Sequence, residues 1–185
     1  MALGPLPLEH TSRAYAILVR VCDFERLDAM GSFRDVGRYW ATNDRLGALL
    51  HQMARVETPE DRLELIKQHR LWGETSDQRA RAHPIRRPPP RPPGEKIRVG
   101  FMSSDLRRHP VAYFAMPVFE GLDPERFEVF CYSFYQGAED DVQRAIAARC
   151  AAYRWKPEIS NAEAAQMIAD DDLDILFELG GATAM

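Results

Sequence analysis

Cysteine is scarce in this sequence, and the few cysteines stand far apart. The 185 residues contain three of them, Cys22, Cys131 and Cys150. A small domain held together by disulfides needs a denser, paired set. No two of these cysteines form a C-x-x-C pair, the usual spacing in structural zinc sites. The sequence therefore predicts buried or partly buried free thiols in a reducing cytoplasm, and no metal site.

Long apolar runs are missing as well. A membrane-spanning helix needs roughly 20 consecutive apolar residues, whereas the apolar runs of this chain extend over only a few. Residues 1–10 have neither a basic start nor a long apolar stretch, so they do not have the pattern of a secretory signal. We therefore expect a cytoplasmic protein with no membrane partner.

The chain has no excess of positive charge. It carries 28 acidic and 24 basic residues, for a net charge of -4, whereas domains that bind nucleic acid are usually strongly basic. The motifs G-x-G-x-x-G, G-x-x-x-x-G-K-[ST], H-E-x-x-H and G-x-S-x-G are also absent. The sequence predicts no nucleic-acid partner and indicates no dinucleotide or P-loop site.

Proline is concentrated in one place. Residues 84–93 read PIRRPPPRPP and hold six of the 13 prolines. Proline fixes φ and has no N–H to donate, so this segment predicts an extended, solvated linker of the polyproline II type. A ligand for a proline-recognition domain, or an anion-binding patch, is the alternative interpretation. The linker, taken as 84–96, separates a helical segment at 1–83 from a different pattern at 97–185.

The segment before the linker has a helical period. Residues 12–30 place apolar side chains close to one helix face, and residues 43–56 repeat that pattern. Asn43 is a suitable N-cap for the second of these helices. The segment 31–40 is ambiguous.

Residues 58–73 predict a complete helix. Thr58 is the expected N-cap, Pro59 occupies the first helical position, and Gly73 is the expected stop. Trp72 belongs to the apolar side of this helix, so we expect its side chain to be largely buried. With the two segments above, this gives a small unit of about three helices.

After the linker, strands alternate with helices. Strands are predicted at 96–102, 127–134, 153–155 and 172–179, and helices at 139–152 and 160–171. Such alternation predicts an α/β fold of about four parallel strands joined by right-handed crossovers. The acids at 170–174 fall between a helix and a strand, where we interpret them as a solvated turn.

In an open parallel sheet, ligands bind beyond the carboxyl ends of the strands. Two loops lie at such ends. The first, SSDLRRHP at 103–110, contains Ser103, Ser104, Asp105 and His109, and the second contains Gly180, Gly181 and Thr183. An imidazole can act as a base or donate to developing charge, and the following proline biases His109 to an extended backbone. The alternative is a helix-capping loop in which Asp105 is the cap and the arginines are solvated.

The same residues resemble a known family. The segment IRVGFMSSDLRRHPVAYFAMPVFEGLDPERFEVFCYSF is similar to the start of the catalytic region of the O-linked N-acetylglucosamine transferase and SPINDLY family. The order SSD, HP, FEVFCY is specific to that region. DLDILFELGGATAM is similar, more loosely, to a later strand and diglycine loop. CDFERLD and ETPEDRLELIKQHRLWGE resemble helices that precede the catalytic core in bacterial members.

The resemblance implies that 97–185 is a partial Rossmann-like N-terminal catalytic lobe, the first half of one lobe of a two-lobed inverting glycosyltransferase. Such enzymes bind a nucleotide sugar, for example UDP-N-acetylglucosamine, mainly through their second lobe, and they use no metal or other cofactor. His109 carries over as a cleft residue and candidate base. The family's second histidine, four residues later, is Tyr113 here, and Ala182 replaces a histidine or tyrosine after the diglycine.

We therefore expect an N-terminal fragment of a protein glycosyltransferase, inactive by itself, whose parent transfers a sugar to a Ser or Thr hydroxyl or to an Asn amide. Its partners would be a polypeptide acceptor and either a missing second lobe or another copy of the chain. A non-catalytic α/β protein-interaction module is the alternative. A flavodoxin-like ligand-binding domain is a third interpretation, which the missing phosphate loop disfavours.

Overall fold

The computed structural model describes residues 10–180. The chain divides into two units, Met1–Pro84 and Ile85–Met185. Across residues 10–180, no helix combines the length and the apolar character needed to cross a membrane.

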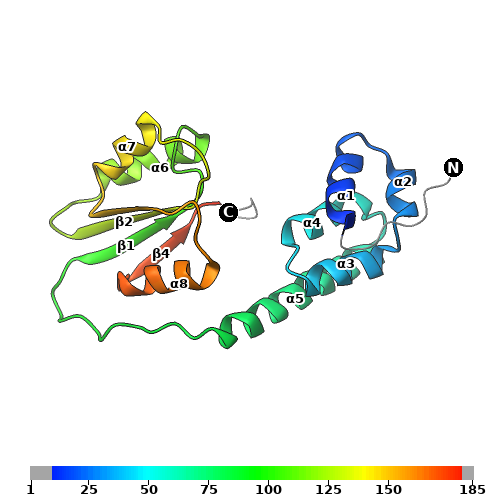
Figure 1. Cartoon of the computed structure of the whole chain (residues 1–185), viewed down its shortest axis with the longest axis horizontal. Coiled ribbons are helices and arrows are strands. Elements are labelled where there is room, and N and C mark those ends of the chain that lie inside the picture. Colours follow the sequence, from blue (N-terminus) through cyan, green and yellow to red (C-terminus); the bar gives the residue numbers. More distant parts are fainter. Residues whose placement is uncertain (1–9, 181–185) are drawn as a thin grey trace. The chain divides into compact units, whose positions relative to one another are not determined.

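The first unit is helical (Figure 1). Its elements are α1 (Thr11–Arg20), α2 (Phe24–Ala29), α3 (Phe33–Thr42), α4 (Leu46–Leu50), a 3-10 helix η2 (His51–Arg55) and α5 (Pro59–Ala82). Its core is formed by Tyr15 and Trp40, which meet edge to face at 4.7 Å between ring centroids, together with Leu27, Val36 and Leu49.

Two of the expected helices are divided differently. The helix predicted at 12–30 is broken, because Cys22 adopts a φ of 56° and Asp23 then caps α2 by accepting from the Arg26 N–H. The prediction that Asn43 is an N-cap was wrong, because Asn43 is the C-cap of α3. Residues 43–56 contain α4 and the 3-10 helix η2 in place of one helix, and the ambiguous segment 31–40 lies mostly in α3.

The third expected helix begins where predicted but does not end there. Thr58 and Asp61 form a reciprocal capping box, and Pro59 is the first helical residue of α5. Gly73 is not a stop, because α5 continues to Ala82. The hydroxyl of Thr75 donates to the carbonyl of Ala41 over 3.1 Å, which ties the continued helix to α3. Trp72 is only half-buried.

The second unit contains a parallel sheet, as predicted. Its strands are β1 (Ile97–Met102), β2 (Phe127–Ser133), β3 (Ala152–Trp155) and β4 (Ile175–Glu178), in the order β3-β2-β1-β4. The helices α6 (Pro110–Gly121) and α7 (Asp141–Ala147) cover one face of the sheet, and α8 (Asn161–Asp170) covers the other (Figure 1). The helix predicted at 139–152 corresponds to α7, which is shorter than expected at both ends.

The two faces of the sheet are packed differently. Toward α6 and α7 lies a continuous apolar core that includes Phe101, Val129, Cys131 and Ile146. On the other face, α8 has no fully buried residue. The backbone of β1 is closely approached here, since a Cβ on Gly100 would lie 2.4 Å from Leu173 Cδ1.

The proline-rich segment is mostly exposed to solvent, but two of its residues contact the rest of the second unit. Residues 84–92 form neither helix nor strand, yet Arg86 pairs with the Gln166 side chain of α8 through its backbone N–H at 2.9 Å and its carbonyl at 2.8 Å. Arg91 forms ion pairs with Asp172 and Asp174. The segment therefore contacts the second unit at Arg86 and Arg91, and Arg91 neutralises two of the acids that follow α8.

The acidic turn is solvated only in part, since Asp170 and Asp174 are exposed. Asp171 is buried, accepts from the Tyr132 hydroxyl at 2.7 Å and pairs with Arg154. Burial by itself would raise the pKa of Asp171, but the hydrogen bonds from Arg154 and Tyr132 and the positive charge of Arg154 hold that pKa below its ordinary value. This carboxylate joins α8 to the sheet.

Candidate functional site

The loop after β1 is held by backbone and buried contacts. Its first residue, Ser103, is fully buried and donates its N–H to the carbonyl of Tyr132 over 3.0 Å. The Ser103 hydroxyl accepts the Asp105 N–H at 3.0 Å. Leu106 is also fully buried, and its carbonyl accepts from the Tyr153 hydroxyl at 2.8 Å. The loop is thus a fixed part of the sheet edge.

His109 is the N-cap of α6. Its backbone is extended, with φ -150° and ψ 150°, as the following proline predicts. Its Nδ1 accepts the N–H of Val111 at 3.3 Å and lies 3.6 Å from Oδ2 of Asp105. The interpretation of Asp105 as the cap was therefore wrong. The imidazole is about one-third exposed, at 36% of its side-chain surface.

This arrangement selects a tautomer. A neutral imidazole that accepts at Nδ1 carries its proton on Nε2. In this state His109 can donate a hydrogen bond through Nε2 to an oxygen of a bound molecule. To accept a proton at Nε2, the ring would have to adopt the other tautomer and give up the cap of α6. The geometry suits a donor better than a base.

Both arginines of the loop pair with protein groups, Arg107 partly buried and Arg108 exposed to solvent. Arg107 pairs with Asp105 at 3.0 Å and stacks over the ring of Tyr135 at 4.3 Å from the centroid. Arg108 donates its backbone N–H to Asp140 at 2.7 Å and its guanidinium to Asp141 at 2.6 Å. The hydrogen bond from Arg108 lowers the pKa of Asp141. The start of α7 thus holds the loop from the other side.

Some polar atoms of the loop remain unsatisfied. Among the described residues, the Ser104 hydroxyl and Arg107 Nε are buried without a hydrogen-bond partner. Buried polar atoms are rarely left unpaired. Together with His109, they give the loop unused hydrogen-bonding capacity at the carboxyl end of β1.

The second predicted loop starts beside the first. β4 pairs with β1 in parallel, and the Leu179 N–H continues the pairing by donating to the Met102 carbonyl at 2.9 Å. Gly180 therefore follows at the same sheet edge as the loop 103–110. Gly181 and Thr183 lie outside the described residues.

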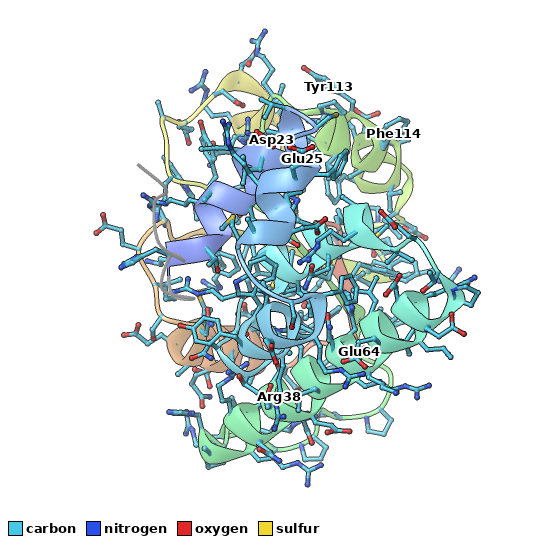
Figure 2. The ribbon with its side chains drawn as sticks, turned by 90° about the vertical axis from the view of Figure 1, so that its right-hand side faces the viewer. Asp23, Glu25, Arg38, Glu64, Tyr113 and Phe114 are labelled. Atoms are coloured by element: carbon cyan, nitrogen blue, oxygen red, sulfur yellow. The ribbon has the colours of Figure 1, made fainter. Side chains whose placement is uncertain are left out.

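The outer face of α6 was missed in the search for site residues. Tyr113 and Phe114 are 54% and 83% exposed, and Figure 2 shows both side chains extending from the helix at the surface. Val118, one turn further, is 45% exposed. A helix that is apolar on all sides is usually covered, and this one begins directly after His109, its N-cap. The signal in the sequence was the run VAYFAMPVF, which lacks a polar face.

No group of three or more histidine, cysteine, aspartate or glutamate side chains is placed to hold a metal ion within residues 10–180. Three grooves of the second unit are lined by residues outside the loop 103–110. One of about 540 Å³ is lined by the proline-rich segment, Asp172 and Asp174, and others flank α8.

Comparison with known families gives the context of this site. The model of glycosyl transferase family 41 matches residues 80–184, more than half of the chain. The chain belongs to glycosyl transferase family 41. The match spans β1, the loop 103–110, α6 and the diglycine, and it confirms the resemblance to O-linked N-acetylglucosamine transferases.

Curated relatives in family 41 are similar over the same part. A protein of Arabidopsis thaliana described as a probable UDP-N-acetylglucosamine–peptide N-acetylglucosaminyltransferase SEC is 29% identical over 102 residues, which are 55% of this chain and 10% of that protein. The UDP-N-acetylglucosamine–peptide N-acetylglucosaminyltransferase of Caenorhabditis elegans is 29% identical over 91 residues, 49% of this chain and 8% of its own. The aligned region is thus about a tenth of the length of these relatives.

Among solved structures, a K341M mutant of the Thermobaculum terrenum O-GlcNAc transferase is similar, with a TM-score of 0.45 and 24% identity over 78% of this chain and 31% of that one.

Proposed function

We propose that this chain supplies one wall of the cleft of a protein glycosyltransferase, in which a sugar passes from a nucleotide sugar to a polypeptide side chain. The main support for the proposal is that the region matched by the family 41 model contains the loop at the end of β1, in which His109 is held as the N-cap of α6. The names of the relatives point to UDP-N-acetylglucosamine as the donor and a peptide as the acceptor. Within that peptide, we propose a Ser or Thr hydroxyl, or an Asn amide, as the group that receives the sugar.

The residues of the wall would have separate tasks. His109 would donate through Nε2 to an oxygen of the acceptor or of the departing diphosphate, where a fixed donor stabilises developing charge. Asp105 would hold Arg107 within the loop, and the unsatisfied hydroxyl of Ser104 would add a second hydrogen bond. Gly180 would begin the neighbouring rim. No metal or other cofactor is needed for these tasks.

The edge strand indicates how the wall is completed. Ile175, Leu176 and Phe177 of β4 are 45%, 43% and 47% exposed, although neighbouring strands of parallel sheets are usually covered on both faces. We propose that further polypeptide covers β4. It would be either a second catalytic lobe, which would bring most of the donor-binding groups, or another copy of the chain.

An NMR titration of the 185-residue chain tests the acceptor part of the proposal. The imidazole signal of His109 is followed while short Ser or Thr peptides are added. The other histidines, His10, His51, His69 and His83, all lie in the first unit and serve as internal controls. We expect the peptides to shift His109 and the backbone signals of 103–110, and to shift a His109→Asn variant less.

Peptides that differ only in a Ser or Ala residue distinguish a transferase site from a non-catalytic interaction module. A Ser peptide that binds better than its Ala counterpart supports recognition of the hydroxyl at a transfer site. Equal binding of both peptides at α6 would favour the non-catalytic interaction module, for which the exposed Tyr113 and Phe114 are the supporting observation. Absence of any shift in 103–110 would contradict both.

A further inference from the structure

Two cysteines that are distant in the sequence meet in the core of the second unit. The Sγ atoms of Cys131 and Cys150 are 3.3 Å apart. Cys131 is at the centre of β2, fully buried, and its strand is paired on both sides with Phe101 of β1 and Tyr153 of β3 as its partners in register. Cys150 is partly exposed and lies on the connection between α7 and β3.

The pair is within reach of a covalent bond. A disulfide requires the sulfur atoms to approach to about 2.0 Å, so the present 3.3 Å would have to shorten by roughly 1.3 Å. Cys131 cannot contribute much to this movement, because two neighbouring strands hold its backbone. Cys150 lies in the turn between α7 and β3, where its N–H donates to the Ala147 carbonyl over 3.3 Å and the next N–H, of Ala151, donates to Val129 over 2.8 Å. The approach of the two sulfur atoms therefore has to come mainly from the Cys150 side chain and an adjustment of this short turn.

The two thiols differ in their tendency to ionise. The hydrogen bond with Cys131 lowers the pKa of Cys150, whereas the interaction with Cys150, together with burial, raises the pKa of Cys131. The thiolate is the nucleophile in exchange with disulfides. The more exposed sulfur is therefore also the more nucleophilic one, and the buried sulfur stands directly behind it.

We propose that Cys131 and Cys150 form a thiol–disulfide exchange site that reacts with small disulfides of the glutathione type. The Cys150 thiolate attacks one sulfur of the small disulfide, forms a mixed disulfide and expels one thiolate. The Cys131 sulfur then loses its proton to solvent, attacks Sγ of Cys150 and expels the second thiolate. The protein gives up two electrons and two protons, and the small disulfide is reduced to two thiols.

The connection that carries Cys150 joins two elements that hold the site loop. At one side, Asp140 and Asp141 at the start of α7 bind Arg108. At the other, Tyr153 of β3 binds the Leu106 carbonyl. The exchange site is thus adjacent to the supports of the loop 103–110, although its own test does not depend on any transferase activity.

Cys22 provides the comparison within the same chain. It is exposed and lies in the first unit, Met1–Pro84, whereas the pair lies in the second. A Cys22→Ser variant therefore removes the unrelated thiol and leaves the pair intact.

The experiment places the native, reduced chain and its Cys22→Ser variant in glutathione buffers of increasing oxidised fraction, followed by acid quenching, alkylation under denaturing conditions and intact-mass and peptide analysis. We expect the Cys22→Ser variant to lose both free thiols together, with a Cys131–Cys150 cross-link in the peptide map. Dithiothreitol should restore both. In the wild-type chain, the third thiol should react separately, as a mixed disulfide.

A second variant separates the attacking from the resolving sulfur. In a Cys22→Ser/Cys131→Ser chain, Cys150 should accumulate as the mixed disulfide with glutathione, because nothing resolves it. The proposal is overturned if the Cys22→Ser chain keeps both thiols under buffers that oxidise the same chain in denaturant. It is equally overturned if glutathione adducts persist there without the internal cross-link.

Discussion

His109 combines a structural and a chemical position in one side chain. Its Nδ1 caps α6 by accepting the Val111 N–H, and this bond fixes the proton of the neutral ring on Nε2. The sequence pattern predicted the extended backbone before Pro110 and the loop position, but not the cap, since histidine is not among the favoured N-cap residues. A substitution at this position therefore changes stability as well as hydrogen bonding.

Replacing His109 separates the two roles. We expect His109→Ala to lower the free energy of unfolding of the second unit by about 1 kcal/mol, the usual cost of a lost N-cap. His109→Asn should leave stability unchanged or slightly higher, since asparagine caps well. Urea unfolding followed by a probe in the second unit measures both. Equal stability of His109→Ala and wild type would show that the cap contributes nothing.

Asp171 is a second residue whose replacement should measurably change the free energy of unfolding. We expect Asp171→Asn to cost about 2 kcal/mol near pH 7, because hydrogen bonds to a charged group are replaced by neutral ones. The folded pKa is below the ordinary value of 3.8, so the carboxylate stabilises the fold fully above that value. The contribution is lost as pH falls through the lower folded pKa.

The pH dependence of Asp171→Asn follows from this linkage. The difference in unfolding free energy between wild type and Asp171→Asn should be constant from pH 7 to about pH 5 and should shrink below pH 4. Urea titrations across this range measure it. A difference that grows on acidification would mean that Asp171 is not held ionised by Arg154 and Tyr132.

At the scale of elements, α5 shows how a tertiary contact overrides a local stop signal. Gly73 carries the sequence signature of a helix end, with Trp72 before it. The helix nevertheless continues to Ala82, because Thr75 bonds to the Ala41 carbonyl of α3 and Trp72 donates to Asp44 at 3.1 Å. A glycine inside a helix lowers its stability, because glycine loses more backbone entropy than other residues. A substitution that removes this entropy loss should stabilise the helix.

Gly73→Ala should therefore stabilise the first unit by about 0.5–1 kcal/mol, because alanine loses less backbone entropy in a helix interior. An added Cβ at Gly73 meets nothing within 4 Å. Thermal or urea unfolding of the helical unit measures the gain. A loss of stability would indicate that Gly73 ends the helix with a positive φ.

Gly37→Ala is the matched control, since Gly37 lies in α3. Its Cβ would fall 2.0 Å from Oε1 of Gln68, a buried side chain of α5 that donates to the Phe33 carbonyl. We expect this substitution to destabilise the same unit. Opposite signs at the two glycines would confirm the packing of α3 against α5.

At the scale of the whole molecule, local signals could be predicted and long-range pairings could not. The alternation of strands and helices and the Thr58 cap of α5 were visible because each depends on neighbouring residues. The pairing of Arg91 with Asp174 and of Cys131 with Cys150 joins residues 83 and 19 positions apart. Nothing in their immediate sequence marks them as partners, and only the folded sheet brings them together.

In the candidate site, too, the local features could be predicted and the contacts between distant residues could not. The loop 103–110 was predicted from its place after a strand, and the structure places His109, Asp105 and Ser104 in it. That the arginines are engaged by Asp105, Asp140 and Asp141 depends on how α7 returns to the sheet. The exposed face of α6 was overlooked, because an apolar helix in a sequence is first assigned to the core.

The last prediction concerns activity: the 185-residue chain alone should not transfer sugar. Transfer requires the anomeric carbon and the acceptor oxygen to be held about 3–3.5 Å apart, with positive groups where the diphosphate gathers charge. In the described part of the second unit, Arg107 and Arg108 are already paired with Asp105 and Asp141.

Incubation with radiolabelled UDP-N-acetylglucosamine and a Ser/Thr peptide library measures this directly. We expect no label on peptide above a reaction without protein, even though the same peptides shift His109 by NMR. Label that appears with the wild-type chain and is lost with His109→Asn would contradict the prediction. It would show that the strand-end loop, with the groups around it in this chain, is sufficient to bring donor and acceptor together.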